Sequence, residues 1–305
     1  MTAIFVRRLV RLLVVMAGVS LVTFSILHVS GDPVALMMPE APEADRAVLR
    51  QQMGFNDPIA TQFGRFVANA VRGDFGQSFF HRAPALGLVL ERMSTTITLT
   101  VLALGLALAV SLPVGIVSAT RPNSLLDHAA TIVVFLGQSM PVFWTGIMLI
   151  LLFAVQWRLF PVSGWDSWSA VVLPALTLGT FSAPLLLRIV RSSMLEVIGL
   201  DYVRTARAKG VSEWMVIWRH ALRNAALPLV TVTGLQFGLL LGAGAVITES
   251  VFAVPGVGRL IVNAIRQLDF PIVQAGVFLL AMIIVTVNFV VDLLYIVLNP
   301  TVRVR

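Results

Sequence analysis

Long apolar segments, separated by shorter polar ones, are the main pattern along this chain. At about 20 residues each, six of these segments are long enough to cross the hydrocarbon core of a bilayer as helices. We expect helices rather than a β-barrel, because the apolar runs are continuous and because backbone amides in lipid need partners within their own segment. The predicted spans are residues 9–28, 96–119, 131–155, 170–190, 226–248 and 271–297.

Composition agrees with a membrane protein. Apolar residues make up 58% of the chain and charged residues 12%, with a mean hydropathy of +0.91, which is far from the balance of a soluble domain. The predicted fold class is therefore all-α, a polytopic membrane protein with six transmembrane helices. The chain has no cysteine, which excludes disulfides and thiolate-bound metals.

Three regions follow from this pattern. Residues 1–28 hold a short tip and the first span, whose apolar run of roughly 18 residues exceeds the about 7–15 of a signal peptide, so we expect it to be retained. Residues 29–95 form an extracytoplasmic loop region with helices at 44–53 and 61–72. This region is either a passive connector or a docking surface for a soluble partner. Residues 96–305 hold the other five spans.

Basic residues predict the orientation of the chain. Most of them lie in segments on one side of the bilayer, and short cytoplasmic loops are enriched in arginine and lysine. Both termini are then cytoplasmic, and the net charge of +7 reflects topology rather than binding of nucleic acid. The residues that set this orientation are Arg7, Arg8, Arg11, Arg121, those from Arg188 to Arg223, Arg303 and Arg305.

The sequence lacks the motifs of an enzyme. Its only lysine, Lys209, precedes a glycine instead of following one, so no P-loop is present to hold ATP phosphates. The four histidines lie in separate segments without metal-ligand spacing, and no Gly-x-Ser-x-Gly motif occurs. We therefore expect no catalytic residue, no metal site and no cofactor bound by this chain.

Ionisable groups are nearly absent from the predicted spans, where ion-coupled carriers hold their relays. The exceptions are Glu249, at the outer end of the fifth span, and Asp292, near the cytoplasmic end of the sixth. A stand-alone channel or ion-coupled carrier would depend on these two carboxylates. A permease driven by another chain would not, and a membrane anchor without transport is a third possibility.

The connection between the fourth and fifth spans, at residues 191–225, is basic and amphipathic. Arg204 and Arg207 share one helical face, while Val203 and Ala206 line the adjacent one.

Gly210 then permits a sharp change of direction. Ser212 is placed to cap a second helix. Such a helix pair fits a groove on a partner protein, and it also fits a layer of lipid headgroups. The second helix is expected to present an apolar seam of Trp214, Ile217, Trp218 and Ala221.

One motif in this connection consists of Arg204-Thr205-Ala206, Gly210 after three more residues, and Leu227-Pro228 downstream. It resembles the EAA loop of ABC importer permeases, in the variant of the oligopeptide and dipeptide permeases. Arg204 stands where the general pattern has a glutamate. Likeness to the B-type subunit of those permeases extends to residues 54–58, 73–78, 139–143 and 249–259.

The resemblance implies a type I ABC importer in the inner membrane of a bacterium. This subunit would pair with a homologous C-type permease in membrane lipid, two ABC ATPases would bind ATP and Mg²⁺, and an extracytoplasmic binding protein would deliver a di- or oligopeptide. Nickel, a metal chelate, glutathione and a saccharide are alternative cargoes. The implied ATPase contacts are Arg204, Thr205, Ala206, Arg207, Lys209, Gly210, Val211 and Trp214.

Glycine and proline residues mark two further regions. The loop 249–270 has the composition of an ordered outer element. Family analogy places its residues Phe252, Pro255, Gly256 and Gly258 at the outer gate or the binding-protein dock, and the alternative is a turn that seats the sixth helix. Because small residues let another helix approach closely, we expect the pathway or a subunit interface at Gly234, Gly238, Gly242 and Pro141.

Overall fold

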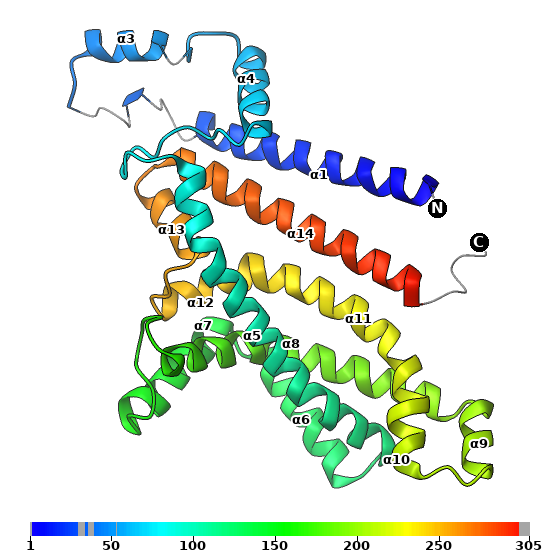
Figure 1. Ribbon diagram of the computed structural model, residues 1–305. Coiled ribbons are helices and arrows are strands. Elements are labelled where there is room, and N and C mark those ends of the chain that lie inside the picture. Colours follow the sequence, from blue (N-terminus) through cyan, green and yellow to red (C-terminus); the bar gives the residue numbers. More distant parts are fainter. Residues whose placement is uncertain (1, 30–33, 36–39, 53, 299–305) are drawn as a thin grey trace. The chain divides into compact units, whose positions relative to one another are not determined.

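The computed structural model of the protein describes residues 2–29, 34–35, 40–52 and 54–298, as Figure 1 shows. The predicted positions Arg303 and Arg305 lie outside these residues, and the side chains of Arg7, Arg8 and Arg11 are not described. The described chain divides into two compact units. One unit comprises Met1–Thr95 with Gly256–Val285, and the other comprises Thr96–Pro255 with Thr286–Arg305.

Helices account for nearly all regular structure in the described residues, with one isolated β-bridge between Gln77 and Pro84. The all-α prediction is confirmed. The α-helices and the π-helical segments (η) are α1 Thr2–Val29, α3 Glu43–Gln52, α4 Ile59–Val71, α5 Ala85–Thr120, α6 Leu125–Ser139, α7 Val142–Leu149, η1 Ile150–Gln156, α8 Trp168–Ile198, α9 Asp201–Ala208, α10 Glu213–Met215, η2 Val216–Ala221, α11 Leu222–Leu239, η3 Leu240–Gly244, α12 Ala245–Val251, α13 Val257–Arg266 and α14 Phe270–Leu298.

Four continuous helical stretches in the described chain are long and apolar enough to cross a membrane, and a fifth span exists if one bent pair is counted. The first predicted span is helical as α1, and its described side chains from Leu12 to Ser25 belong to an apolar helix. The four stretches are Ala85–Thr120, Trp168–Ile198, Glu213–Val251 and Phe270–Leu294.

The third predicted span is broken into two helices. α6 and α7 meet at a bend of 105°. Pro141 cannot donate a backbone hydrogen bond, and the residue before a proline is pushed out of the α region. Met140 accordingly has φ −89° and ψ 125°, and Pro141 has φ −61° and ψ 138°.

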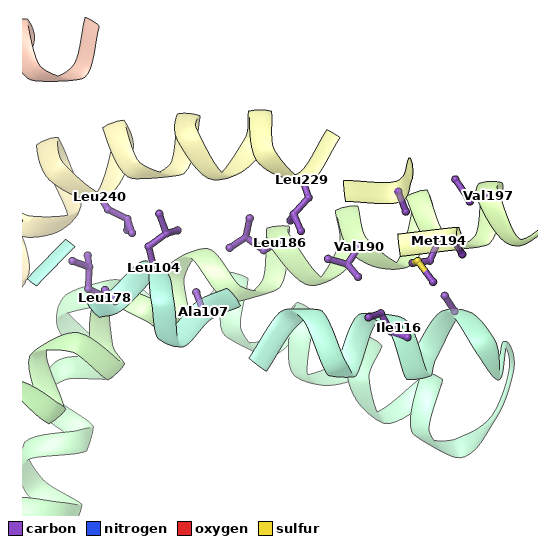
Figure 2. Close-up of a cluster of buried hydrophobic side chains, with 14 of the residues drawn as sticks. Leu104, Ala107, Ile116, Leu178, Leu186, Val190, Met194, Val197, Leu229 and Leu240 are labelled. Atoms are coloured by element: carbon purple, nitrogen blue, oxygen red, sulfur yellow. The ribbon is translucent and has the colours of Figure 1, made fainter. Parts of the chain in front are cut away.

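The unit that contains Thr96–Pro255 is built around α5, α8 and α11. Figure 2 shows part of its apolar core, with Ile116 on α5, Val190 and Met194 on α8 and Leu229 on α11. α5 and α8 approach closely, because a β-carbon added to Gly115 would lie only 2.7 Å from Cγ1 of Val190. Side chains of α9 and η2 belong to the same core, which therefore reaches the connection between the fourth and fifth predicted spans.

The unit that contains Met1–Thr95 holds the predicted loop helices, which are confirmed as α3 and α4. A chain of aromatic contacts runs through it, with ring centroids 5.3 Å apart for Phe24 and Phe63 and 5.3 Å apart for Phe75 and Phe278. Asp269 is fully buried just before α14. Its carboxylate accepts hydrogen bonds from the Ser78 hydroxyl and from the backbone N–H groups of Phe79 and Phe80.

Candidate functional site

Two residues separate the end of α8 from the start of α9, and α9 lies on the core through one face. Val203 is completely buried and Ala206 nearly so, and both contact the cluster that contains Val216 and Ala221. The predicted division of faces is confirmed, because Arg204 and Arg207 lie on the exposed side. The basic face of α9 is thus presented outward by a helix whose position is set by core packing.

Gly210 ends α9 in a Schellman motif. Its φ of +73° lies in the left-handed region, which glycine adopts without strain. The N–H of Gly210 donates to the carbonyl of Arg207 at 2.9 Å, and the N–H of Val211 donates to that of Ala206 at 3.3 Å. Since a β-carbon at Gly210 would meet nothing within 4 Å, only the backbone angle requires glycine here.

Two aromatic side chains project beyond this turn. Trp214 is 70% exposed, and its ring lies 5.0 Å from that of Trp218. The predicted apolar seam runs from these exposed rings to Ile217, which packs against the core, and to Ala221, which is buried in it. Ser212 stands at the start of α10 but makes no capping hydrogen bond through its side chain, so the predicted cap is wrong.

Charged groups of the loop pair locally. Arg207 makes two bonds to the Glu213 carboxylate, at 2.7 and 3.1 Å, and Arg204 lies 3.6 Å from Asp201. The Arg207 contact lowers the pKa of Glu213 and raises the pKa of Arg207, because each charge stabilises the other. Thr205 donates to the Asp201 carbonyl at 2.9 Å.

Hydrogen bonds also hold the C-terminal end of the loop. Asn224 donates to the Tyr202 hydroxyl at 2.7 Å, and that hydroxyl lies 3.4 Å from the His220 carbonyl. These contacts join α9 to the start of α11 across the π-helical segment η2. Lys209 and Val211 complete the predicted set, the first exposed and the second half-buried.

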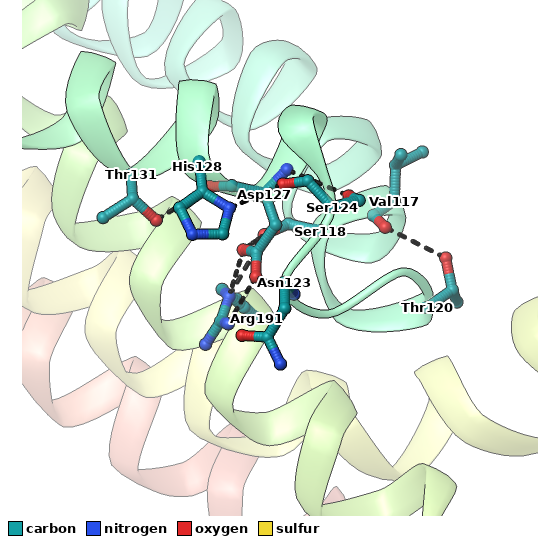
Figure 3. Close-up of polar contacts among 9 residues, drawn as sticks. All are labelled: Val117, Ser118, Thr120, Asn123, Ser124, Asp127, His128, Thr131 and Arg191. Carbon is teal, nitrogen blue, oxygen red and sulfur yellow. Dashed lines mark hydrogen bonds and ion pairs between the residues drawn. The ribbon is translucent and has the colours of Figure 1, made fainter.

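An ion pair that the sequence analysis missed lies at the same end of α8. Arg191 contacts both carboxylate oxygens of Asp127, at 2.7 and 2.8 Å (Figure 3). Ser118, at the end of α5, donates to the same carboxylate, and the N–H of Asn123 does so at 3.0 Å. Four segments thus meet at one aspartate, namely α5, the following turn, α6 and α8.

The predicted outer-gate residues fall in both compact units. Phe252 is buried against Ala154, Leu173 and Val254, and its carbonyl accepts from the N–H of Gly164 at 3.1 Å. Pro255 is half-buried. In the other unit, Gly256 immediately precedes α13, and both Gly256 and Gly258 are buried.

The glycines of the fifth span lie in α11 and η3. A β-carbon at Gly234 would come within 2.2 Å of Val291, so the close neighbour there is α14 of this chain. Gly238 is buried and Gly242 half-buried. A role of these positions or of Pro141 in a pathway or a subunit interface stays a prediction.

The two carboxylates of the predicted spans have different environments. Glu249 is fully buried and accepts a hydrogen bond from Thr96 at 2.6 Å, whereas Asp292 is half-buried. Within the described residues, no three histidine, aspartate or glutamate side chains gather as metal ligands do.

Comparison with known proteins identifies the family. Residues 111–304 match the family described as "Binding-protein-dependent transport system inner membrane component", and residues 1–100 match "Binding-prot-dependent transport system membrane comp, N-term". The dipeptide transport system permease protein DppB of Escherichia coli (strain K12) is 41% identical, over 99% of both chains. The glutathione transport system permease protein GsiC of the same strain is 40% identical, over 98% of both chains.

Solved structures show the same fold. The MetNI methionine ABC transporter in inward-facing conformations matches with a TM-score of 0.56 at 20% identity, covering 70% of this chain and 96% of that chain. A crystal structure of an amino acid ABC transporter with histidines matches with a TM-score of 0.52 at 16% identity, covering 68% and 93%. With the spans described above, the chain is a multi-pass inner-membrane protein. It belongs to the family of inner membrane components of binding-protein-dependent transport systems.

Proposed function

We propose that this chain is the B-type permease subunit of an ATP-driven ABC importer of di- and oligopeptides. The observation that carries the proposal is the 41% identity to DppB along nearly the whole of both chains. The chain binds no nucleotide in this proposal. It forms the translocation path with a homologous C-type permease, while two ATPase subunits bind ATP and Mg²⁺ and an extracytoplasmic protein delivers the peptide.

Glutathione is the second candidate cargo. The identity to the glutathione permease GsiC is 40%, nearly equal to that with DppB. Glutathione is itself a tripeptide, so both relatives support a short substrate with peptide bonds and free charged termini. Nickel, a metal chelate and a saccharide stay predictions from the family resemblance.

In this proposal the ATPases contact the loop from α9 to α10. Its exposed side offers Arg204, Lys209 and Trp214, and its buried side is held by Val203 and Ala206. Exposed tryptophan and arginine are typical anchors of protein interfaces. The loop and both termini are then cytoplasmic, and residues 29–95 face the outside together with the dock around Phe252.

Purification of the chain from its native membrane tests the proposal. We expect a second permease and two ATPase subunits in fixed ratio. In liposomes, that complex should take up labelled dipeptide only with ATP and the binding protein present. Competition by unlabelled dipeptide or by glutathione then identifies the cargo. A chain that moves a solute alone, without ATP, would contradict the proposal and favour a channel or carrier dependent on Glu249 and Asp292.

A further inference from the structure

The Asp127–Arg191 pair lies where α8 leads into the proposed coupling loop. Arg191 lies seven residues, or about 10 Å of helix, before Ile198 at the end of α8, and two further residues lead to Asp201 at the start of α9. Between them, Met194 of α8 packs in the same core as Val203 of α9 and Ile116 of α5. The pair therefore lies on helices that share an apolar core with α9.

Geometry and burial make this pair a directional connection. The Asp127 side chain is 5% exposed and that of Arg191 is 32% exposed. Two parallel bonds between a guanidinium and a carboxylate fix both distance and orientation. Apolar contacts between α5 and α8 do not fix orientation in this way, because dispersion and burial are not directional.

We propose that Asp127 and Arg191 are positioning residues for transport. Their ion pair holds the turn between α5 and α6 against α8, so that α5, α6 and α8 move together when the ATPases displace α9. This inference rests on the proposed function, since it needs α9 to be the element that the ATPases move. Removal of the pair should then reduce the peptide transported per ATP hydrolysed, while the ATPases stay bound.

The test uses the whole complex in liposomes with its binding protein. Asp127→Asn keeps the shape of the side chain and one acceptor oxygen but removes the charge. We expect the peptide transported per ATP to fall by about fivefold or more, within the usual range of coupling energies, with ATP hydrolysis retained. Arg188→Gln is the matched control. Arg188 lies one turn earlier on α8 and bonds to the neutral Gln138 at 2.8 Å, at an exposed site, and this variant should transport like the wild type.

Two further variants show whether the residues act as a pair. Arg191→Lys keeps the charge but not the two parallel bonds, and should have an intermediate ratio of transport to hydrolysis. The double variant Asp127→Asn with Arg191→Gln should transport no less peptide per ATP than the less active single variant. The reason is that the double variant and each single variant remove the same interaction. If Asp127→Asn does not assemble, Arg191→Lys supplies the same measurement.

Rescue by a covalent link separates a connecting role from a folding role. The chain contains no cysteine, so the substitutions Asp127→Cys and Arg191→Cys introduce two thiols that are unique within it. A short dithiol-reactive linker between them should restore the transport ratio. An unchanged ratio in Asp127→Asn or Arg191→Lys, or no rescue by the linker, would overturn the proposal. A wild-type complex without ATP-dependent uptake would instead overturn the proposed function.

Discussion

One buried aspartate anchors each compact unit, and the two are satisfied differently. Asp127 forms an ion pair with Arg191, and its carboxylate also accepts hydrogen bonds from a hydroxyl and a backbone N–H. Asp269 accepts from the Ser78 hydroxyl and two backbone N–H groups, and no ion pair is found for it among the described residues. One aspartate joins helices through side chains, and the other fixes the backbone of a loop.

The difference indicates different roles. Hydrogen bonds from consecutive N–H groups hold residues 78–80 in one conformation, as a static loop requires. An ion pair between helices instead keeps separate elements in register, which suits a unit that transmits movement. The predictions below test this contrast between a connected coupling unit and a fixed loop unit.

The largest effect is expected from Gly210→Pro. Proline fixes φ near −65° and lacks the N–H, whereas Gly210 has φ +73° and donates to Arg207. The Schellman motif cannot form, so the angle at which the chain continues from α9 into α10 is no longer fixed. We expect ATP-dependent uptake to be abolished while the chain stays inserted in the membrane, as measured by uptake in liposomes and by the amount of chain in the membrane.

Gly210→Asn is the matched control for this change. Asparagine tolerates the left-handed region better than other residues with a β-carbon, and the site has free space around the glycine. Most of the uptake should remain. Equal loss of uptake in both variants would show that the turn geometry is not the cause.

Asp269→Ala should give the next largest effect, on folding rather than on coupling. It leaves the buried Ser78 hydroxyl and two part-buried N–H groups without their acceptor, and the buried hydroxyl alone costs about 1–3 kcal/mol. We expect faster proteolysis of the loop at residues 76–84 and a lower unfolding temperature. The peptide transported per ATP by the surviving complex should not change.

Asp74→Ala controls for the loss of an aspartate in the same loop. Its carboxylate accepts from the N–H of Gly76 at 2.9 Å, but at an exposed site where water can replace it. The unfolding temperature should stay close to that of the wild type. Equal destabilisation by the two variants would remove the distinction between a buried anchor and a surface turn.

The sequence predicted local features well and distant contacts poorly. Continuous apolar runs identified the helices, since hydrophobicity needs no knowledge of neighbours. Pro141 interrupts the third predicted span, but a proline alone does not predict a bend of 105° between α6 and α7. The pair of Asp127 and Arg191 joins residues 64 positions apart. For this pair the sequence offers only a local signal. Ser124 stands three residues before Asp127, in a pattern that is typical of a helix start.

The coupling loop shows a further limit of pattern analysis. A regular period of 3.6 residues assigned Val203 and Ala206 correctly, because α9 is a regular helix. The π-helical segment over Val216–Ala221 was not predicted from this period. A π-helical turn is wider than an α-helical one and shifts the faces of the helix. The faces of the residues that follow Trp214 therefore required the structure.

Trp214→Asp should weaken the binding of the ATPases. A tryptophan anchor in an interface is typically worth about 2 kcal/mol, or about thirtyfold in affinity, and the 70% exposure leaves it free to enter a groove. Co-purification of the ATPases measures the effect. Trp168→Asp is the matched control, since Trp168 is 80% exposed at the other end of α8. Unchanged retention in Trp214→Asp would favour a loop that lies on lipid headgroups.

The smallest effect is expected from Glu213→Gln, which removes the ion pair with Arg207. The pair is exposed, at 37% for Arg207 and 56% for Glu213, so solvent screening limits its contribution to about 1 kcal/mol or less. Hydrogen exchange at the N–H of Gly210 measures this local stability. The exchange rate in the variant should rise by about fivefold at most.

The pH dependence follows from the lowered pKa of Glu213. A carboxylate with a lowered pKa stabilises the folded loop above its unfolded pKa, and this stabilisation is lost as the pH falls through the folded value. The protection of the Gly210 N–H, measured as its exchange rate relative to an unfolded peptide at the same pH, should therefore be constant near neutrality and fall only in acid. Glu213→Gln should lose this acid dependence, because glutamine does not titrate. A wild-type loop whose protection is already lost at neutral pH would show that the Arg207 contact does not hold the turn, and that the buried side of α9 alone sets the position of the coupling loop.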